Sequence, residues 1–140
     1  MISDNEEETL NQQGIDLAQQ GDALKSIPLF RRAIRVAPAY AQAHHNLGIA
    51  LAQTGDLEQA IDAFTDSLRI DPNYAEAHTS MANTLYGQKK YAEAVEAYRK
   101  SLRLRPDSPG ALNGLGLALI ALKRPAHAAP RGPEAPTAAA

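Results

Sequence analysis

The chain has 140 residues, enough for one domain, and its formal net charge of −2 provides no bulk attraction to nucleic acid or to an anionic membrane. It contains no Cys, which excludes disulfides, thiolate metal sites and a cysteine nucleophile. Apolar residues make up 44% of the sequence, but only two Phe and five Tyr contribute aromatic volume. We therefore expect a core in which helices approach one another closely over small residues.

The first residues, MISDNE, are acidic and contain no apolar run, so we expect no signal peptide there. No segment of the sequence is apolar over the length that a bilayer requires. These features favour a cytoplasmic protein with an acidic N-terminal extension over residues 1–6.

One phrase recurs along the chain at a spacing of 34 residues. It is RVAPAYAQAH at 35–44, RIDPNYAEAH at 69–78 and, more altered, RLRPDSPGAL at 103–112. A fixed period of this length indicates stacked supersecondary units. The units predicted from it are 7–40, 41–74 and 75–108, with a partial fourth over 109–124.

The second unit shows the pattern most clearly. Its segments 41–54 and 57–70 carry apolar residues at helical spacing, and each is as long as an ordinary helix. Gly55 separates them, Asp56 is the expected N-cap of the second helix with Gln59 three residues on, and Pro72 prevents that helix from continuing. Each full unit is therefore predicted to be a helical hairpin.

Small and large residues recur in register, which predicts where helices touch. The small ones are Gly14, Gly48, Ala82 and Gly116, and the large ones are Phe30, Phe64 and Tyr98. A hairpin of this length cannot bury its apolar face alone, so neighbouring hairpins must stack. In the first unit, Pro28 is expected to kink the second helix or to delay its start.

The last predicted helix covers 111–124 and follows Ser108 as N-cap and Pro109 at the first helical position. Beyond it, residues 125–140 are rich in Pro and Ala and are predicted to be a disordered tail. Leu117, Ile120 and Leu122 leave this helix with few polar positions, and the two ends of the chain carry opposite charge. Self-association through the last helix is therefore one hypothesis for the function.

The segment NLGIALAQTGDLEQAIDAFTDSLRIDPNYAEA, 46–77, closely resembles the tetratricopeptide repeat, and the resemblance extends over about 7–122. It implies an all-α, right-handed superhelical solenoid of three helical hairpins with a C-terminal capping helix. Departures from the family pattern are Gln13 in place of Leu, Ser26 in place of Ala, and Lys89-Lys90 in place of Gly-Asp.

The resemblance also implies a function, because the first helices of such hairpins line a concave groove that binds peptides or partner segments. Amides and hydroxyls dominate the equivalent positions, which suits an extended backbone. The implied groove residues are Asn11, Gln12, Ile15, Gln42, His45, Asn46, Ile49, Gln53, Glu76, Thr79, Ser80, Asn83, Tyr86, Asn113 and Leu117. The expected partner is a protein or peptide, with no nucleic acid, membrane or cofactor involved.

Two branches of the family provide comparisons. In one, Lys, Asn and Arg clamp the terminal carboxylate of chaperones; only Asn46 matches here, while Glu76 and Ser80 replace a Lys and an Arg, which disfavours an anionic tail. In the other, an Asn ladder serves a glycosyltransferase; the register here reads Gln12, Asn46, Ser80, Gly114 and keeps a single Asn. A fragment of a larger enzyme resembling O-GlcNAc transferase stays an alternative hypothesis.

The sequence predicts no catalytic or metal site of its own. His44 and His78 lie in register at a helix-packing position, and no pair of His has the i, i+4 spacing of a metal site. No Ser or Thr has the neighbouring base that would activate it. We therefore predict a protein-interaction scaffold and not an enzyme.

Overall fold

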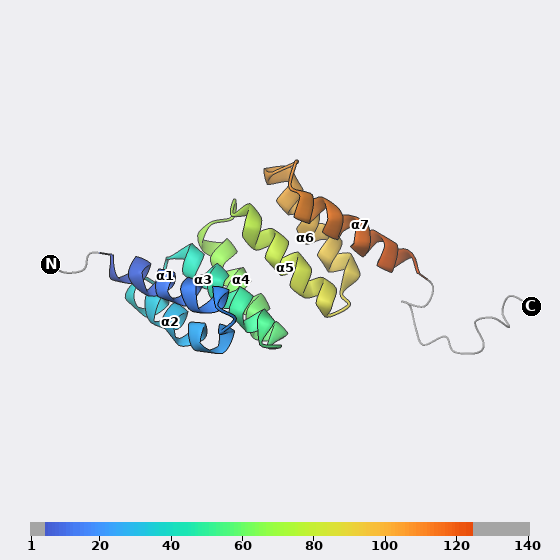
Figure 1. Ribbon diagram of the computed structural model, residues 1–140. Helices are drawn as coiled ribbons and strands as arrows, with labels where there is room; N and C mark the ends of the chain where they lie inside the picture. Colours follow the sequence, from blue (N-terminus) through green and yellow to red (C-terminus); the bar gives the residue numbers. More distant parts are fainter. Residues whose placement is uncertain (1–4, 125–140) are drawn as a thin grey trace, which may run out of the picture.

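The computed structural model describes residues 5–124, which form seven helices and no strands (Figure 1). The helices are α1 (Glu6–Gln19), α2 (Ala23–Val36), α3 (Ala41–Gln53), α4 (Leu57–Ile70), α5 (Ala75–Gly87), α6 (Tyr91–Leu104) and α7 (Pro109–Lys123). The helix predicted at 57–70 is α4, and the one predicted at 41–54 ends one residue earlier. The predicted tail 125–140 and most of the predicted extension 1–6 lie outside the described residues.

Consecutive helices pack against one another along the chain. α1 packs on α2, α3 on α4 and α5 on α6, and each of these pairs contacts the next. α7 packs on α6 and, to a smaller extent, on α5. The result is an all-α solenoid in which α1 and α7 lie at opposite ends (Figure 1). Among the described residues, no helix has the length and apolarity needed to cross a bilayer.

The helix starts follow the predicted chemistry. The Asp56 side chain accepts from the Gln59 amide at 3.4 Å, and Ser108 accepts from the Ala111 amide at 3.3 Å with Pro109 in the first turn. Pro28 lies inside α2, but this helix already begins at Ala23. The predicted delay of its start is therefore wrong: five residues precede the ring, so the first turn forms without the proline.

The three turns within the hairpins need one left-handed residue each. Gly21 has a φ of 88° and Gly55 a φ of 92°, while Lys89 occupies the third such turn with a φ of 66°. A side chain in this region costs about 1 kcal/mol relative to glycine. The departure at Lys89 noted in the sequence is thus a local strain at the turn between α5 and α6.

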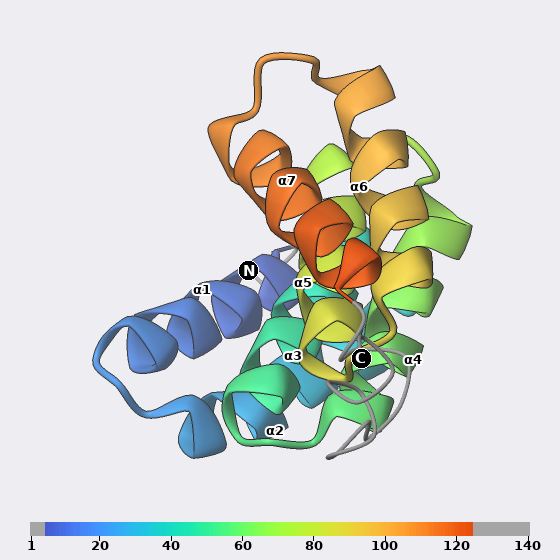
Figure 2. The same cartoon turned by 90° about the vertical axis from the view of Figure 1, so that its right-hand side faces the viewer.

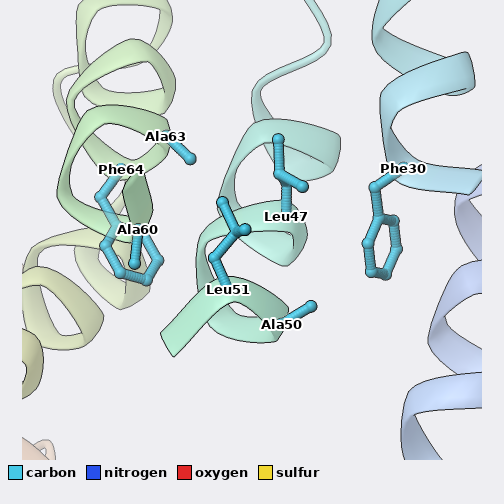
Figure 3. Close-up of a cluster of buried hydrophobic side chains, with 7 residues drawn as sticks. All are labelled: Phe30, Leu47, Ala50, Leu51, Ala60, Ala63 and Phe64. Carbon is cyan, nitrogen blue, oxygen red and sulfur yellow. The ribbon is translucent and has the colours of Figure 1, made fainter. Parts of the chain in front are cut away.

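The buried core is divided near the junction of α4 and α5. One cluster joins α2, α3 and α4 around Phe30 and Phe64 (Figure 3). A second joins α5, α6 and α7 around Val95 and Tyr98, and a small third one joins α1, α2 and α3 and shares Ile34 with the first. Met81 of α5, which is half-buried, lies at the edge of the first cluster. The apolar core is therefore least continuous between the second and third hairpins.

Glycine allows an aromatic ring to pack directly against a helix. This contact forms only where a neighbouring helix lies over the glycine. A Cβ at Gly14 would lie 2.5 Å from the Phe30 ring, and one at Gly48 would lie 2.5 Å from the Phe64 ring. At Gly116 a Cβ would meet nothing within 4 Å, so the prediction of a helix contact there is wrong. No described helix covers that side of α7. The Tyr98 ring instead lies against Gly114, two residues earlier.

Candidate functional site

The solenoid has two faces, each built from alternate helices. α1, α3, α5 and α7 form one side, the first-helix face, and α2, α4 and α6 form the other, the second-helix face (Figure 2). Each first helix contacts the next one along this face. The residues predicted for partner binding all belong to the first helices, so this face is the candidate site.

Two cavities on the first-helix face are related by the 34-residue period. The first, of about 330 Å³, lies between α1 and α3 over the ring of Phe30; the second, of about 310 Å³, lies between α3 and α5 over the ring of Phe64. We call them the two sockets. The first is lined by Ile15, Ala18, Gln19, Phe30, Asn46, Ile49 and Gln53, and the second by Ile49, Ala52, Gln53, Phe64, Ser80, Asn83 and Thr84. Neither contains a charged side chain.

Six of the predicted residues come together in the sockets, and two of these take part in both. Ile49 is half-buried and Gln53 is exposed, and each lines both cavities. The other four are Ile15, Asn46, Ser80 and Asn83. The sockets also contain residues that the sequence does not predict for the site, namely Ala18, Gln19, Ala52, Thr84 and the two Phe rings. The 34-residue register of Phe30 with Phe64 indicates the floors of the sockets, but from sequence alone it predicts only contacts between helices.

Several predicted residues are engaged in hydrogen bonds between repeats. Asn11 is 7% exposed, donates to the Tyr40 hydroxyl at 3.2 Å and accepts from Asn46 at 3.0 Å. One period later, His45 takes the place of Asn11, with its Nδ1 3.2 Å from the Tyr74 hydroxyl and its Nε2 2.9 Å from Ser80 Oγ. Asn11 and His45 thus link neighbouring hairpins through hydrogen bonds that lie beneath the first-helix face.

His45 is buried among aromatic rings, which sets its protonation state. Its ring centroid lies 4.9 Å from that of Tyr74 and 5.8 Å from that of Phe64. Burial lowers the pKa of His45 to about 4, although the nearby Glu76 carboxylate acts to raise it. Burial and, to a smaller extent, Glu76 raise the pKa of Tyr74 to about 12. At neutral pH the imidazole is therefore uncharged. One of its ring nitrogens donates a hydrogen bond to one hydroxyl, and the other accepts a hydrogen bond from the second hydroxyl.

The remaining predicted residues lie around the sockets or turn away from them. Gln12 is exposed and donates to Asp16 at 2.9 Å, and the Glu76 carboxylate is held by Arg105. Thr79 is directed to α6, where its hydroxyl lies 2.6 Å from that of Ser101. The other four line neither socket: Gln42 and Asn113 are exposed, Tyr86 packs edge-on against Tyr91 with ring centroids 5.2 Å apart, and Leu117 is 47% exposed.

The third hairpin differs from the first two at this face. The Tyr98 hydroxyl reaches across to donate to Asn83, and its ring occupies the space beside Gly114. The Tyr98 side chain thus lies between Asn83 of α5 and Gly114 of α7. Within residues 5–124, no group of three His, Asp or Glu side chains is arranged as a metal site would require.

Comparison with known proteins agrees with this architecture. Models of the tetratricopeptide repeat match residues 11–75 and 63–96, and one of the TPR repeat matches 82–122. A search of curated proteins finds no match. Together the repeat models extend over 11–122, which is most of the described chain.

Solved structures similar to the chain include several tetratricopeptide repeat domains. The first TPR of Spaghetti (RPAP3), bound to the HSP90 peptide SRMEEVD, has a TM-score of 0.84 at 19% identity, over 88% of this chain and 98% of that one. The Sgt2 TPR domain from Aspergillus fumigatus has a TM-score of 0.81 at 23% identity, over 84% and 80%. A mutant O-GlcNAc transferase from Thermobaculum terrenum has a TM-score of 0.79 at 26% identity, over 85% of this chain and 23% of that one.

The seven-helix solenoid, the 34-residue register of its packing residues and the matching repeat models agree with one another. The chain belongs to the tetratricopeptide repeat family.

Proposed function

We propose that the chain is a protein-interaction module whose first-helix face binds a segment of a partner protein in the two sockets. The observation that carries the proposal is the pair of register-related cavities, each with a Phe ring as its floor, aliphatic walls and a rim of amides or hydroxyls. Such a surface offers apolar burial to side chains and hydrogen bonds to a peptide backbone. A similar TPR domain is known in complex with an HSP90 peptide, which supports this use of the fold.

The chemistry of the sockets favours a ligand with uncharged anchors. No cation lines either cavity, and the nearby Glu76 carboxylate already pairs with Arg105. An acidic peptide such as SRMEEVD would find no charge-assisted partner there. The proposed ligand is therefore an internal segment with two apolar side chains and not an acidic C-terminal tail.

The test is capture of partners by the native chain and by Ile49→Gln, because Ile49 lines both sockets. We expect the native chain to retain partners from a lysate of its source cells, and Ile49→Gln to lose them by about tenfold or more. Leu24→Gln is the matched control, since Leu24 is 71% exposed on α2, away from the sockets. Equal capture by the native and Ile49→Gln chains would contradict the proposal.

Self-association through α7 is a second candidate function. Leu112, Leu117 and Ile120 are 51%, 47% and 57% exposed, although a helix that is apolar on all sides is normally buried. If a second copy covers this face, the native chain should show a concentration-dependent mass in analytical ultracentrifugation, and Ile120→Glu should be monomeric. A native chain that stays monomeric at high concentration would exclude this role.

A further inference from the structure

The second-helix face contains a larger cavity, which we call the α4–α6 groove. Its volume is about 610 Å³; α4 and α6 form its walls and α5 its floor. The floor is apolar, with Met81 and Leu85 from α5 beside Leu68 from α4 and Ala97 from α6. Its walls are helices of the second-helix face, whereas the sockets lie between helices of the first-helix face.

A smaller counterpart of this groove exists one repeat earlier. That cavity, the α2–α4 groove, has a volume of about 370 Å³. Its lining residues are those of the α4–α6 groove shifted by 34 positions, except that Glu58, the equivalent of Ala92, does not line it. Across its mouth Arg31 donates to the Gln59 side chain at 3.2 Å, which joins α2 to α4. Beneath them, the floor residues Leu47 and Leu51 are 9% and 5% exposed.

Two substitutions between the repeats account for the difference. Thr65 stands where the earlier groove has Arg31, and Glu93 stands where it has Gln59. The short Thr65 side chain cannot reach α6, whereas an arginine stem covers the apolar floor below it. The floor residues Met81 and Leu85 are accordingly only half-buried. The α4–α6 groove is thus a larger version of a cavity that Arg31 and Gln59 bridge one repeat earlier.

The larger groove coincides with the junction where the apolar core is divided. The core cluster around Phe64 ends at α4 with Met81 at its edge, and the cluster around Tyr98 begins in α5 and α6. An apolar side chain seated among Leu68, Met81 and Ala97 would join the two clusters. The site therefore gains packing that the free chain lacks.

The shape and charge of the walls select the occupant. The stretch of α6 along the groove runs from Ala92 to Lys100, about 12 Å of helix, which matches a stripe of side chains at i, i+3 and i+7 on a partner helix. Glu93 and Glu96 line this wall, with Lys100 at its C-terminal end, while the opposing Arg69 is engaged by Asp66 at 2.7 Å. Glu93 forms no ion pair among residues 5–124, and Glu96 only a loose one with Arg99 at 3.6 Å.

We propose that the α4–α6 groove binds an amphipathic helix of a partner protein, which seats a stripe of apolar side chains on the Leu68–Met81–Leu85 floor and places basic residues against Glu93 and Glu96. The site is independent of the two sockets, so the chain would hold two segments on opposite faces. This inference stands or fails separately from the function proposed for the first-helix face.

The probe is a synthetic helical peptide of about fourteen residues with leucines at i, i+3 and i+7 and lysines on its flanks. Met81 is one of two methionines in the chain, so its methyl group is a nearly unique NMR reporter at the floor of the groove. We expect the Met81 methyl signal to shift and saturate during titration. A matched peptide with glutamate in place of every lysine should bind about tenfold more weakly.

Two variants derived from the repeat test the location. Thr65→Arg with Glu93→Gln copies the α2–α4 bridge and should weaken binding about tenfold or more, while the reciprocal Arg31→Thr with Gln59→Glu should add a second binding site. Circular dichroism establishes that each variant is folded, and Ala92→Trp at the exposed mouth is an alternative block if the first does not fold. An unmoved Met81 signal, equal binding of the acidic peptide, or undiminished binding by the bridged variant would overturn the proposal.

Discussion

Gly48→Ala is expected to destabilise the chain by about 2–3 kcal/mol, even though alanine is the better helix former. The new Cβ would stand 2.5 Å from Cε1 of Phe64, 2.7 Å from Cδ1 and 2.9 Å from Cζ. Phe64 is 1% exposed, so its ring can give way only by shifting against the side chains packed around it. In the third hairpin Ala82 is tolerated at the same register because the Tyr98 ring lies over Gly114, but the residue equivalent to Gly114 beside Phe64 is Ser80.

Gly116→Ala is the matched control for this prediction. It makes the same change, in register, at a position where a Cβ meets nothing within 4 Å, so we expect a gain of about 1 kcal/mol from helix propensity alone. Urea unfolding of the three proteins provides the comparison. A neutral Gly48→Ala would contradict the ring contact, and a destabilised Gly116→Ala would mean that a partner covers α7.

Between pH 7.5 and pH 5, the free energy of unfolding is expected to fall by about 2 kcal/mol because of His45 alone. The folded pKa of about 4 lies below the unfolded value of 6.5, so the unfolded chain binds the proton first as pH decreases. The stabilising contribution is complete above pH 6.5 and is lost progressively as the pH approaches 4. The groups that face the ring are Tyr74 and Ser80, which hydrogen-bond to it, and the Glu76 carboxylate.

His45→Asn removes the titratable imidazole but leaves a side chain that can still form hydrogen bonds. Asparagine is the residue that the first repeat uses at this place, where Asn11 bonds to Tyr40 and Asn46. The variant should keep partners in Tyr74 and Ser80 but lose most of the pH dependence over this range, which thermal unfolding at a series of pH values would measure. A variant with the same slope as the native chain would assign the dependence to other groups.

The sequence predicts the helix bounds well, because the hydrophobic period and the helix caps depend on residues that are close together in the chain. The bounds of α4 and the caps at Asp56 and Ser108 follow from adjacent residues alone. The helix contact predicted at Gly116 is wrong, because the 34-residue register identifies equivalent positions but does not establish that a neighbouring helix covers them.

The candidate site was predictable only in part. The family pattern places Asn11 and His45 on the first helices, but whether their polar atoms serve a ligand or a neighbouring repeat depends on Tyr40 and Tyr74, about 29 residues away in each case. The α4–α6 groove was not predicted at all. Its signal was the replacement of Arg31 and Gln59 by Thr65 and Glu93 in an otherwise faithful repeat.

The most direct test of partner binding on the first-helix face is photocrosslinking from Gln53, which is exposed and lines both sockets. A benzoylphenylalanine at this position in cells of the source organism is expected to form a defined crosslinked product with a partner protein. The same group at Leu24 should not form this product. A product that appears equally from Leu24, or that fails to appear from Gln53 while other surface positions yield one, would contradict binding in the sockets.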